Sequence, residues 1–201
     1  MSWFLVDKAS GNPNRHSSYK AWKEDLRHEG RRQCVYCCVR EGSFGGYRNF
    51  HVEHYRPKSL YSALADSYQN LFYACAICNS FKSDAWPGDP NEDLSNPAFP
   101  DPSKVDYSTF MSVAGDGTVV GSNVSAMYTV ERLYLNRPQL VVDRRLRRLE
   151  LRFLELLRIA RGFSADDRAK VLLAPLWMEA SELLVQMRAN APYEPSDIRR
   201  A

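Results

Sequence analysis

The chain has 201 residues, of which 44% are hydrophobic and 25% charged, and its formal net charge at pH 7 is +3. This composition is typical of globular proteins, and the length suffices for one domain with a real core and an appended helical part. No apolar run approaches the ~20 residues of a membrane-spanning helix. The N-terminal residues also lack the basic segment and apolar core of a secretory signal, so we expect a cytoplasmic protein with reduced cysteines.

The sequence of the N-terminal half predicts short helices and strands. Residues 17–30 predict a helix that ends near Gly30, because apolar side chains recur at helical spacing (Tyr19, Trp22, Leu26). Residues 34–55 predict a turn at the cysteines and short strands around a glycine-rich loop. The segment 70–84 begins apolar and ends polar, and a short helix is expected from about Ile77.

The second half begins with a stretch that excludes regular structure, because residues 86–103 contain five prolines. Residues 109–122 predict a β-hairpin whose turn is supplied by Gly115 to Gly117. The remainder is expected to be helical. Residues 140–163 carry one apolar stripe (Val142, Leu146, Leu149, Phe153, Leu156), a last helix is predicted from about Ser164 to Met187, and the tail 191–201 is expected to be loose.

Four of the five cysteines form two C-x2-C pairs separated by 37 residues (Cys34 and Cys37, Cys75 and Cys78). Each such turn delivers two thiolates from one tight bend, and four thiolates suit tetrahedral zinc. The intervening residues would form a loop that the metal clamps at both ends. The fifth cysteine, Cys38, is expected to be a packed thiol. The alternative to a zinc site is that these are unrelated buried cysteines.

The clamped loop contains "HVEHYRPKS", residues 51–59. Hydrolysis of a phosphodiester needs an activated water and a cation near the leaving oxygen. A histidine such as His54 can take a proton from water near neutral pH, and a carboxylate and an amide oxygen can hold a divalent ion. If this segment is a strand, Glu53 and His54 point to opposite sides.

The string "CVYC … VEHYRPKS … NLFYACAICNSFK" resembles an HNH endonuclease of the ββα-metal class with zinc knuckles, over roughly residues 31–84. The resemblance implies that His54 is the general base and that Asn70 orients the loop. It further implies that Glu53 and Asn79 bind the catalytic ion, Mg²⁺ or Mn²⁺, and that the four paired cysteines bind structural zinc. Asn79 stands where the family name has a final histidine, and its oxygen suits Mg²⁺.

More loosely, residues 94–102, the hairpin and residues 129–145 are similar to the downstream half of HNH nucleases from bacterial retron and anti-phage defence loci. That likeness implies an ATPase partner, with the helices at roughly 125–190 as its docking surface. We therefore expect an α+β fold, with a nuclease domain in residues 1–110 and a hairpin with helices in residues 111–201.

Three cations adjoin the expected site, and we predict that they contact DNA phosphates (Arg56, Lys58, Lys82). Residues 132–161 contain nine arginines against three acidic residues. This helix could grip DNA or a partner, or it could be a solvated face on which Glu150 and Glu155 pair with nearby arginines.

Two other functions remain open. A zinc-dependent nucleobase deaminase has an H-x-E and a P-C-x-x-C motif, which His51 to Glu53 and Cys75 to Cys78 match in outline. That interpretation leaves Cys34 and Cys37 without a role, and Ala74 replaces the proline. A non-catalytic zinc-ribbon module that binds nucleic acid needs only the cysteines and cations.

Overall fold

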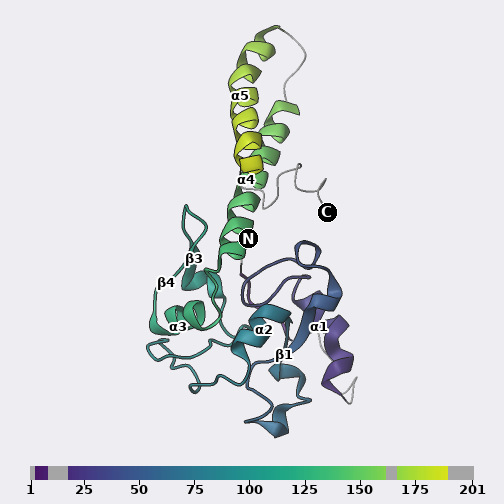
Figure 1. The fold of residues 1–201 in the computed structure, drawn as a ribbon, viewed down its shortest axis with the longest axis vertical. Helices are drawn as coiled ribbons and strands as arrows, with labels where there is room; N and C mark the ends of the chain where they lie inside the picture. The colour runs from purple at the N-terminus through teal and green to yellow at the C-terminus, as the bar shows by residue number, and fades with distance from the viewer. Residues whose placement is uncertain (1–2, 9–17, 162–166, 190–201) are drawn as a thin grey trace, which may run out of the picture. The chain divides into compact units, whose positions relative to one another are not determined.

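The computed structural model describes residues 3–8, 18–161 and 167–189. The chain divides into two compact units, residues 2–140 and 141–201. The described part mixes helices with small antiparallel strand pairs, which confirms the α+β prediction (Figure 1). The predicted helix start at Ser164 and the tail 191–201 lie outside the described residues.

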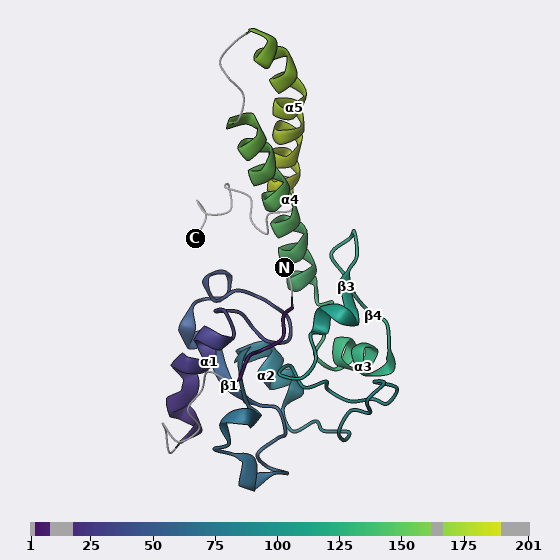
Figure 2. The same cartoon turned by 180° about the vertical axis from the view of Figure 1, so that it is seen from behind.

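The centre of the first unit is a strand–strand–helix arrangement. Strand β1 (Phe50–His54) pairs antiparallel with β2 (Leu71–Cys75), with Glu53 opposite Phe72, and helix α2 (Ala76–Lys82) follows β2 directly. In both ribbon views α2 lies beside β1 (Figure 1, Figure 2). All five residues of β2 are buried, because its apolar and aromatic side chains pack on both faces. The short helix expected from Ile77 is thus present one residue earlier.

The predicted N-terminal helix is also present. A 3-10 turn (Tyr19–Trp22) leads into α1 (Lys23–Glu29), and Trp22 and Leu26 are each 1% exposed. Gly30 ends the helix, as expected. A side chain there would be in tight contact with the sheet, since a Cβ on Gly30 would lie 3.1 Å from Tyr73 Cβ. The close approach of α1 to β2 therefore favours a residue without a side chain at this position.

Further elements complete the first unit. The predicted hairpin is confirmed as β3 (Met111–Val113) and β4 (Val119–Gly121), followed by helix α3 (Val124–Arg132). The proline-containing residues 86–103 form no helix or strand, as predicted. Short 3-10 turns occupy Glu41–Ser43, Tyr47–Asn49, Ser62–Leu64, Tyr68–Asn70 and Tyr107–Thr109.

Two long helices, α4 (Pro138–Arg161) and α5 (Asp167–Ala189), make up the C-terminal part. The apolar stripe of α4 packs against α5 in a small core (Leu149, Phe153, Leu156, Leu176, Ala180, Leu183). Arg152 bridges Glu155 on its own helix and Glu179 on α5. Leu149, Phe153 and Leu156 of the predicted stripe are therefore internal core. The charge of Arg152 on the arginine-rich face is balanced by its two acidic neighbours.

Candidate active site and zinc site

The four paired cysteines converge on one point. Their sulfur atoms all lie within 4.8 Å of one another, and each side chain is completely buried. Cys37 Sγ and Cys75 Sγ are 3.8 Å apart. A zinc tetrahedron with Zn–S bonds of ~2.3 Å has edges of about 3.8 Å. The cluster therefore has the ligands and the spacing of a structural zinc site.

The chemistry of the sulfurs points to a cation as well. Burial raises the pKa of the Cys34 thiol well above its ordinary value, because a thiolate is poorly solvated in an apolar interior. Four thiolates in such a place need a cation to balance them, and zinc takes thiolate ligands. His51 is not part of this cluster. The geometry thus contradicts the deaminase interpretation, in which His51 shares zinc with Cys75 and Cys78.

Cys38 is buried and lies next to the first knuckle, as expected for a packed thiol. Its backbone has φ of +58°, and its N–H donates to Cys34 O. This left-handed conformation turns the chain back after Cys37, so that Cys34 N–H can donate to Val39 O. The residue shapes the knuckle and does not supply a ligand.

An arginine lies against the cysteine cluster. Arg137 Nη2 lies 3.7 Å from Cys78 Sγ and 3.9 Å from Cys37 Sγ, and Nη1 lies 3.8 Å from Cys78 Sγ. Its guanidinium also donates to the carbonyl oxygens of Leu133 and Tyr134. A tetrathiolate zinc centre carries a net negative charge, so this guanidinium offsets part of it. The sequence provided no signal for this contact, because 59 residues separate Arg137 from Cys78.

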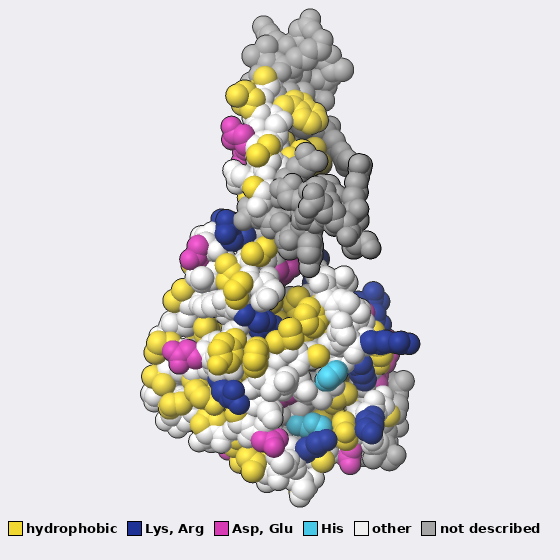
Figure 3. All heavy atoms as spheres, viewed as in Figure 1, with side chains coloured by type: hydrophobic (Ala, Val, Ile, Leu, Met, Phe, Trp, Pro, Cys, Tyr) yellow, Lys and Arg dark blue, Asp and Glu magenta, His cyan; other side chains and the backbone are white. Residues whose placement is uncertain are grey.

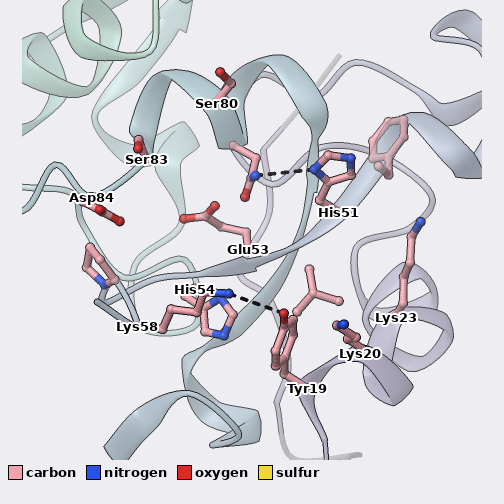
Figure 4. Close-up of a pocket in the computed structure, with 14 residues that line it drawn as sticks. Tyr19, Lys20, Lys23, His51, Glu53, His54, Lys58, Ser80, Ser83 and Asp84 are labelled. Atoms are coloured by element: carbon pink, nitrogen blue, oxygen red, sulfur yellow. Dashed lines mark hydrogen bonds between the residues drawn. The ribbon is translucent and has the colours of Figure 1, made fainter. Parts of the chain in front are cut away.

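Strand β1 directs its last two side chains to opposite faces, as predicted for Glu53 and His54. Glu53 faces α2, where its Oε1 lies 2.8 Å from Lys82 Nζ. The ring of His54 faces the other way and meets the ring of Tyr19 edge-on, with centroids 4.9 Å apart. Both residues nevertheless line one pocket of about 550 Å³ at the end of the strand (Figure 4). Asn79 lines the same pocket.

His54 is held in one orientation by the backbone. Its Nε2 lies 2.9 Å from Ala65 O. A carbonyl oxygen only accepts hydrogen bonds, so Nε2 carries the proton, and in the neutral ring Nδ1 keeps a free lone pair. Burial lowers the pKa of His54, and the positive charges of Lys58 and Lys82 add to this effect. The ring is therefore a neutral base at physiological pH.

Asn70 closes the loop that carries His54. Its Oδ1 accepts from Arg56 N at 2.8 Å, and its Nδ2 donates to Arg56 O at 3.0 Å and to Leu64 O at 3.2 Å. Asn70 itself is buried, and its three hydrogen bonds are part-buried. Asn70 thereby connects Arg56, two residues after His54, to Leu64. Leu64 directly precedes Ala65, whose carbonyl oxygen contacts His54.

Glu53 belongs to a fully buried ion pair. Its side chain is 4% exposed and that of Lys82 is not exposed at all. Tyr36 Oη donates to the same oxygen at 3.3 Å, and Lys82 Nζ also donates to His54 O at 2.8 Å. Burial raises the pKa of Glu53, while the charge of Lys82 opposes the rise. A carboxylate that lines the same pocket as the Asn79 amide provides the oxygen ligands that suit a divalent ion.

The burial of Lys82 does not support the predicted contact between this residue and DNA phosphate. It is three residues after Asn79, but that rotation around α2 turns Lys82 toward the sheet and away from solvent. Arg56 is also engaged, since its guanidinium lies 2.8 Å from Asp89 Oδ1. Among the three predicted phosphate contacts, Lys58 is exposed and lines the pocket, where its Nζ donates to Tyr19 Oη at 3.4 Å.

The N-terminal 3-10 turn and α1 contribute pocket residues that the sequence interpretation missed (Tyr19, Lys20, Lys23). The sequence feature that could have identified them is the pair Lys20 and Lys23, which are three positions apart on a predicted helix and therefore on one face of it. In the space-filling view, histidine side chains lie among lysine and arginine side chains on the face shown (Figure 3). The pocket therefore combines a base, a carboxylate, an amide and several cations.

The two strands and the helix form a ββα unit beside a cluster of four cysteines that is compatible with a zinc site. Residues 34–85 match the model of the HNH endonuclease family. This match confirms the resemblance to HNH endonucleases that was inferred for residues 31–84. A search of the curated proteins gives no match. Within the described residues, no helix is both long and apolar enough to cross a membrane.

Proposed function

We propose that this protein is a metal-dependent endonuclease that hydrolyses phosphodiester bonds of DNA. The observation that carries the proposal is the neutral, oriented His54 in the same pocket as Glu53 and Asn79. These are the three chemical parts that such a reaction needs: a base, and two oxygen ligands for an ion. The HNH match supports the same class of reaction.

In this proposal, His54 Nδ1 takes a proton from the attacking water, and Ala65 O holds the imidazole at the correct angle. Asn70 keeps the loop closed, so that Ala65 and His54 stay in register. Glu53 and Asn79 would hold Mg²⁺ or Mn²⁺, and such an ion would supply positive charge for the developing negative charge of the leaving oxygen. The products are a 5′-phosphate and a 3′-hydroxyl. Lys58 and the pocket lysines 20 and 23 attract the phosphate backbone.

The zinc on the four cysteines is structural in this proposal. Both knuckles adjoin the strands that carry the site, since Cys75 is the last residue of β2 and caps α2 through its sulfur. Binding energy at such a site is largely folding energy. Zinc on these cysteines would hold the junction of β2 and α2 against the first knuckle and so would keep Asn79 at the pocket.

Plasmid cleavage with Mg²⁺ or Mn²⁺ tests the nuclease proposal. We expect His54→Ala to abolish scission and to leave zinc content and DNA binding unchanged. His28→Ala is a matched control, because that exposed histidine pairs with Glu24 on α1 and does not line the pocket. A fully active His54→Ala variant would refute the general-base role. DNA binding by the wild-type protein without scission would identify a non-catalytic zinc-ribbon module.

The wider setting is a proposal that depends on the sequence alone. The likeness of residues 94–102 and 129–145 to retron and anti-phage nucleases supports a role as a cytoplasmic defence effector with an ATPase partner. Residues 111–201, with α4 and α5, would supply the partner surface, and residues 1–110 the nuclease. Co-purification of an ATPase encoded beside this chain, lost when residues 141–201 are deleted, is the expected result.

A further inference from the structure

His51 has no role in the mechanism above, yet it shares the pocket with the two proposed metal ligands. It precedes Glu53 by two positions in β1, so both side chains project from the same face of the strand. That face is the one covered by α2: Glu53 meets Lys82, and His51 meets Asn79. Figure 4 shows His51 and Glu53 extending from one strand into the pocket.

The distance between His51 and Asn79 suits two ligands of one ion. His51 Nδ1 lies 3.5 Å from Asn79 Nδ2, which is at the long limit of a hydrogen bond. Two ligand atoms that each lie ~2.1 Å from an ion are about 3.0–3.4 Å apart in octahedral or tetrahedral geometry. Rotating the Asn79 amide by half a turn places Oδ1 where Nδ2 lies, since the two ends have nearly the same shape.

From this geometry we propose that His51 is a third protein ligand of the catalytic ion, beside Glu53 and Asn79, and that the site selects a first-row transition ion over Mg²⁺. Imidazole nitrogen is a common ligand of transition ions, whereas Mg²⁺ takes oxygen ligands. His51 is exposed, so its Nδ1 can reach an ion without any change in the core. This inference depends on the proposed catalytic site and specifies which ion that site holds.

Metal binding by the zinc-loaded full chain tests the proposal without any activity assay. Mn²⁺ is the probe, and its affinity is measured from the electron paramagnetic resonance signal of the free ion, with Mg²⁺ as competitor. We expect His51→Ala to weaken Mn²⁺ binding about tenfold or more. The affinity for Mg²⁺ should change much less, whereas a merely structural role for His51 would weaken both ions equally and would overturn the proposal.

Electron spin-echo modulation from a directly bound ¹⁴N nucleus provides a second readout. We expect this modulation in the wild-type protein and in His54→Ala, the variant of the other pocket histidine, and its loss in His51→Ala. Modulation that disappears with His54 instead would overturn the assignment.

Glu53→Gln separates this inference from the proposed function. If that variant loses Mn²⁺ while His51→Ala keeps full affinity and the nitrogen modulation, the third-ligand proposal is overturned and the two-ligand site stands. If the zinc-loaded wild-type chain binds no Mn²⁺ at all, the proposed catalytic site fails together with it.

Discussion

Replacing Lys82 with methionine removes the cation from the buried pair with Glu53. In the wild-type protein Lys82 Nζ lies 2.8 Å from both Glu53 Oε1 and His54 O, and the side chain has no exposed surface. Methionine preserves most of the volume, but it leaves the buried carboxylate of Glu53 with only the Tyr36 hydroxyl as a donor and removes the donor to His54 O. Breaking one side of such a pair costs about 3–5 kcal/mol. For a protein of this size, that loss lowers Tm by roughly 6–20 °C.

Urea unfolding of the zinc-loaded protein, followed by circular dichroism, measures the loss. Lys58→Met is the matched control, because Lys58 lines the same pocket but is exposed, and we expect a change within about 0.5 kcal/mol. Without Lys82 the carboxyl of Glu53 can take up a proton, which limits the cost. The loss should therefore be smaller at pH 5 than at pH 8. A Lys82→Met variant within about 1 kcal/mol of wild type at pH 8 would refute the buried-pair argument.

Four further outcomes are expected. Asn70→Ala removes three hydrogen bonds from the loop and should reduce cleavage about 100-fold at unchanged zinc content; near-normal cleavage would contradict its positioning role. Burial lowers the pKa of His54 below 6.5, so the cleavage rate should rise with pH and level off, with a midpoint below pH 6.5. The contribution of neutral His54 to stability should be lost as the pH falls below 6.5. A midpoint of the rate profile above pH 7 would contradict the general-base role. Cys75→Ser should lower zinc stoichiometry and unfold the domain, so a folded variant with full zinc content would exclude the structural role. Arg137→Gln should speed the release of zinc to a chelator, with Arg132→Gln as control, and equal release rates would show that the guanidinium contacts do not retain the ion.

Local sequence patterns were enough to predict the helices, the hairpin and the cluster of four cysteines. Helices, hairpin turns and C-x2-C knuckles depend on residues a few positions apart, so their signals are present in short segments. The spacing of Trp22 and Leu26 predicts the buried face of α1, and the two cysteine pairs predict the cluster. Strand alternation correctly predicts that Glu53 and His54 diverge. The order of these motifs along residues 34–85 identifies the HNH domain.

Contacts between distant segments were decided only in three dimensions. Lys82 is charged, and in the sequence it has the pattern of a phosphate contact, but its position around α2 turns it toward the sheet and buries it against Glu53. Arg137 reaches the cysteine sulfurs across 59 residues, and His51 meets Asn79 across 28. A side chain's partner depends on how whole elements pack, and that packing is set by the shapes and burial of many residues together. Residue type and spacing therefore predict which groups are available, while the fold determines which of them meet.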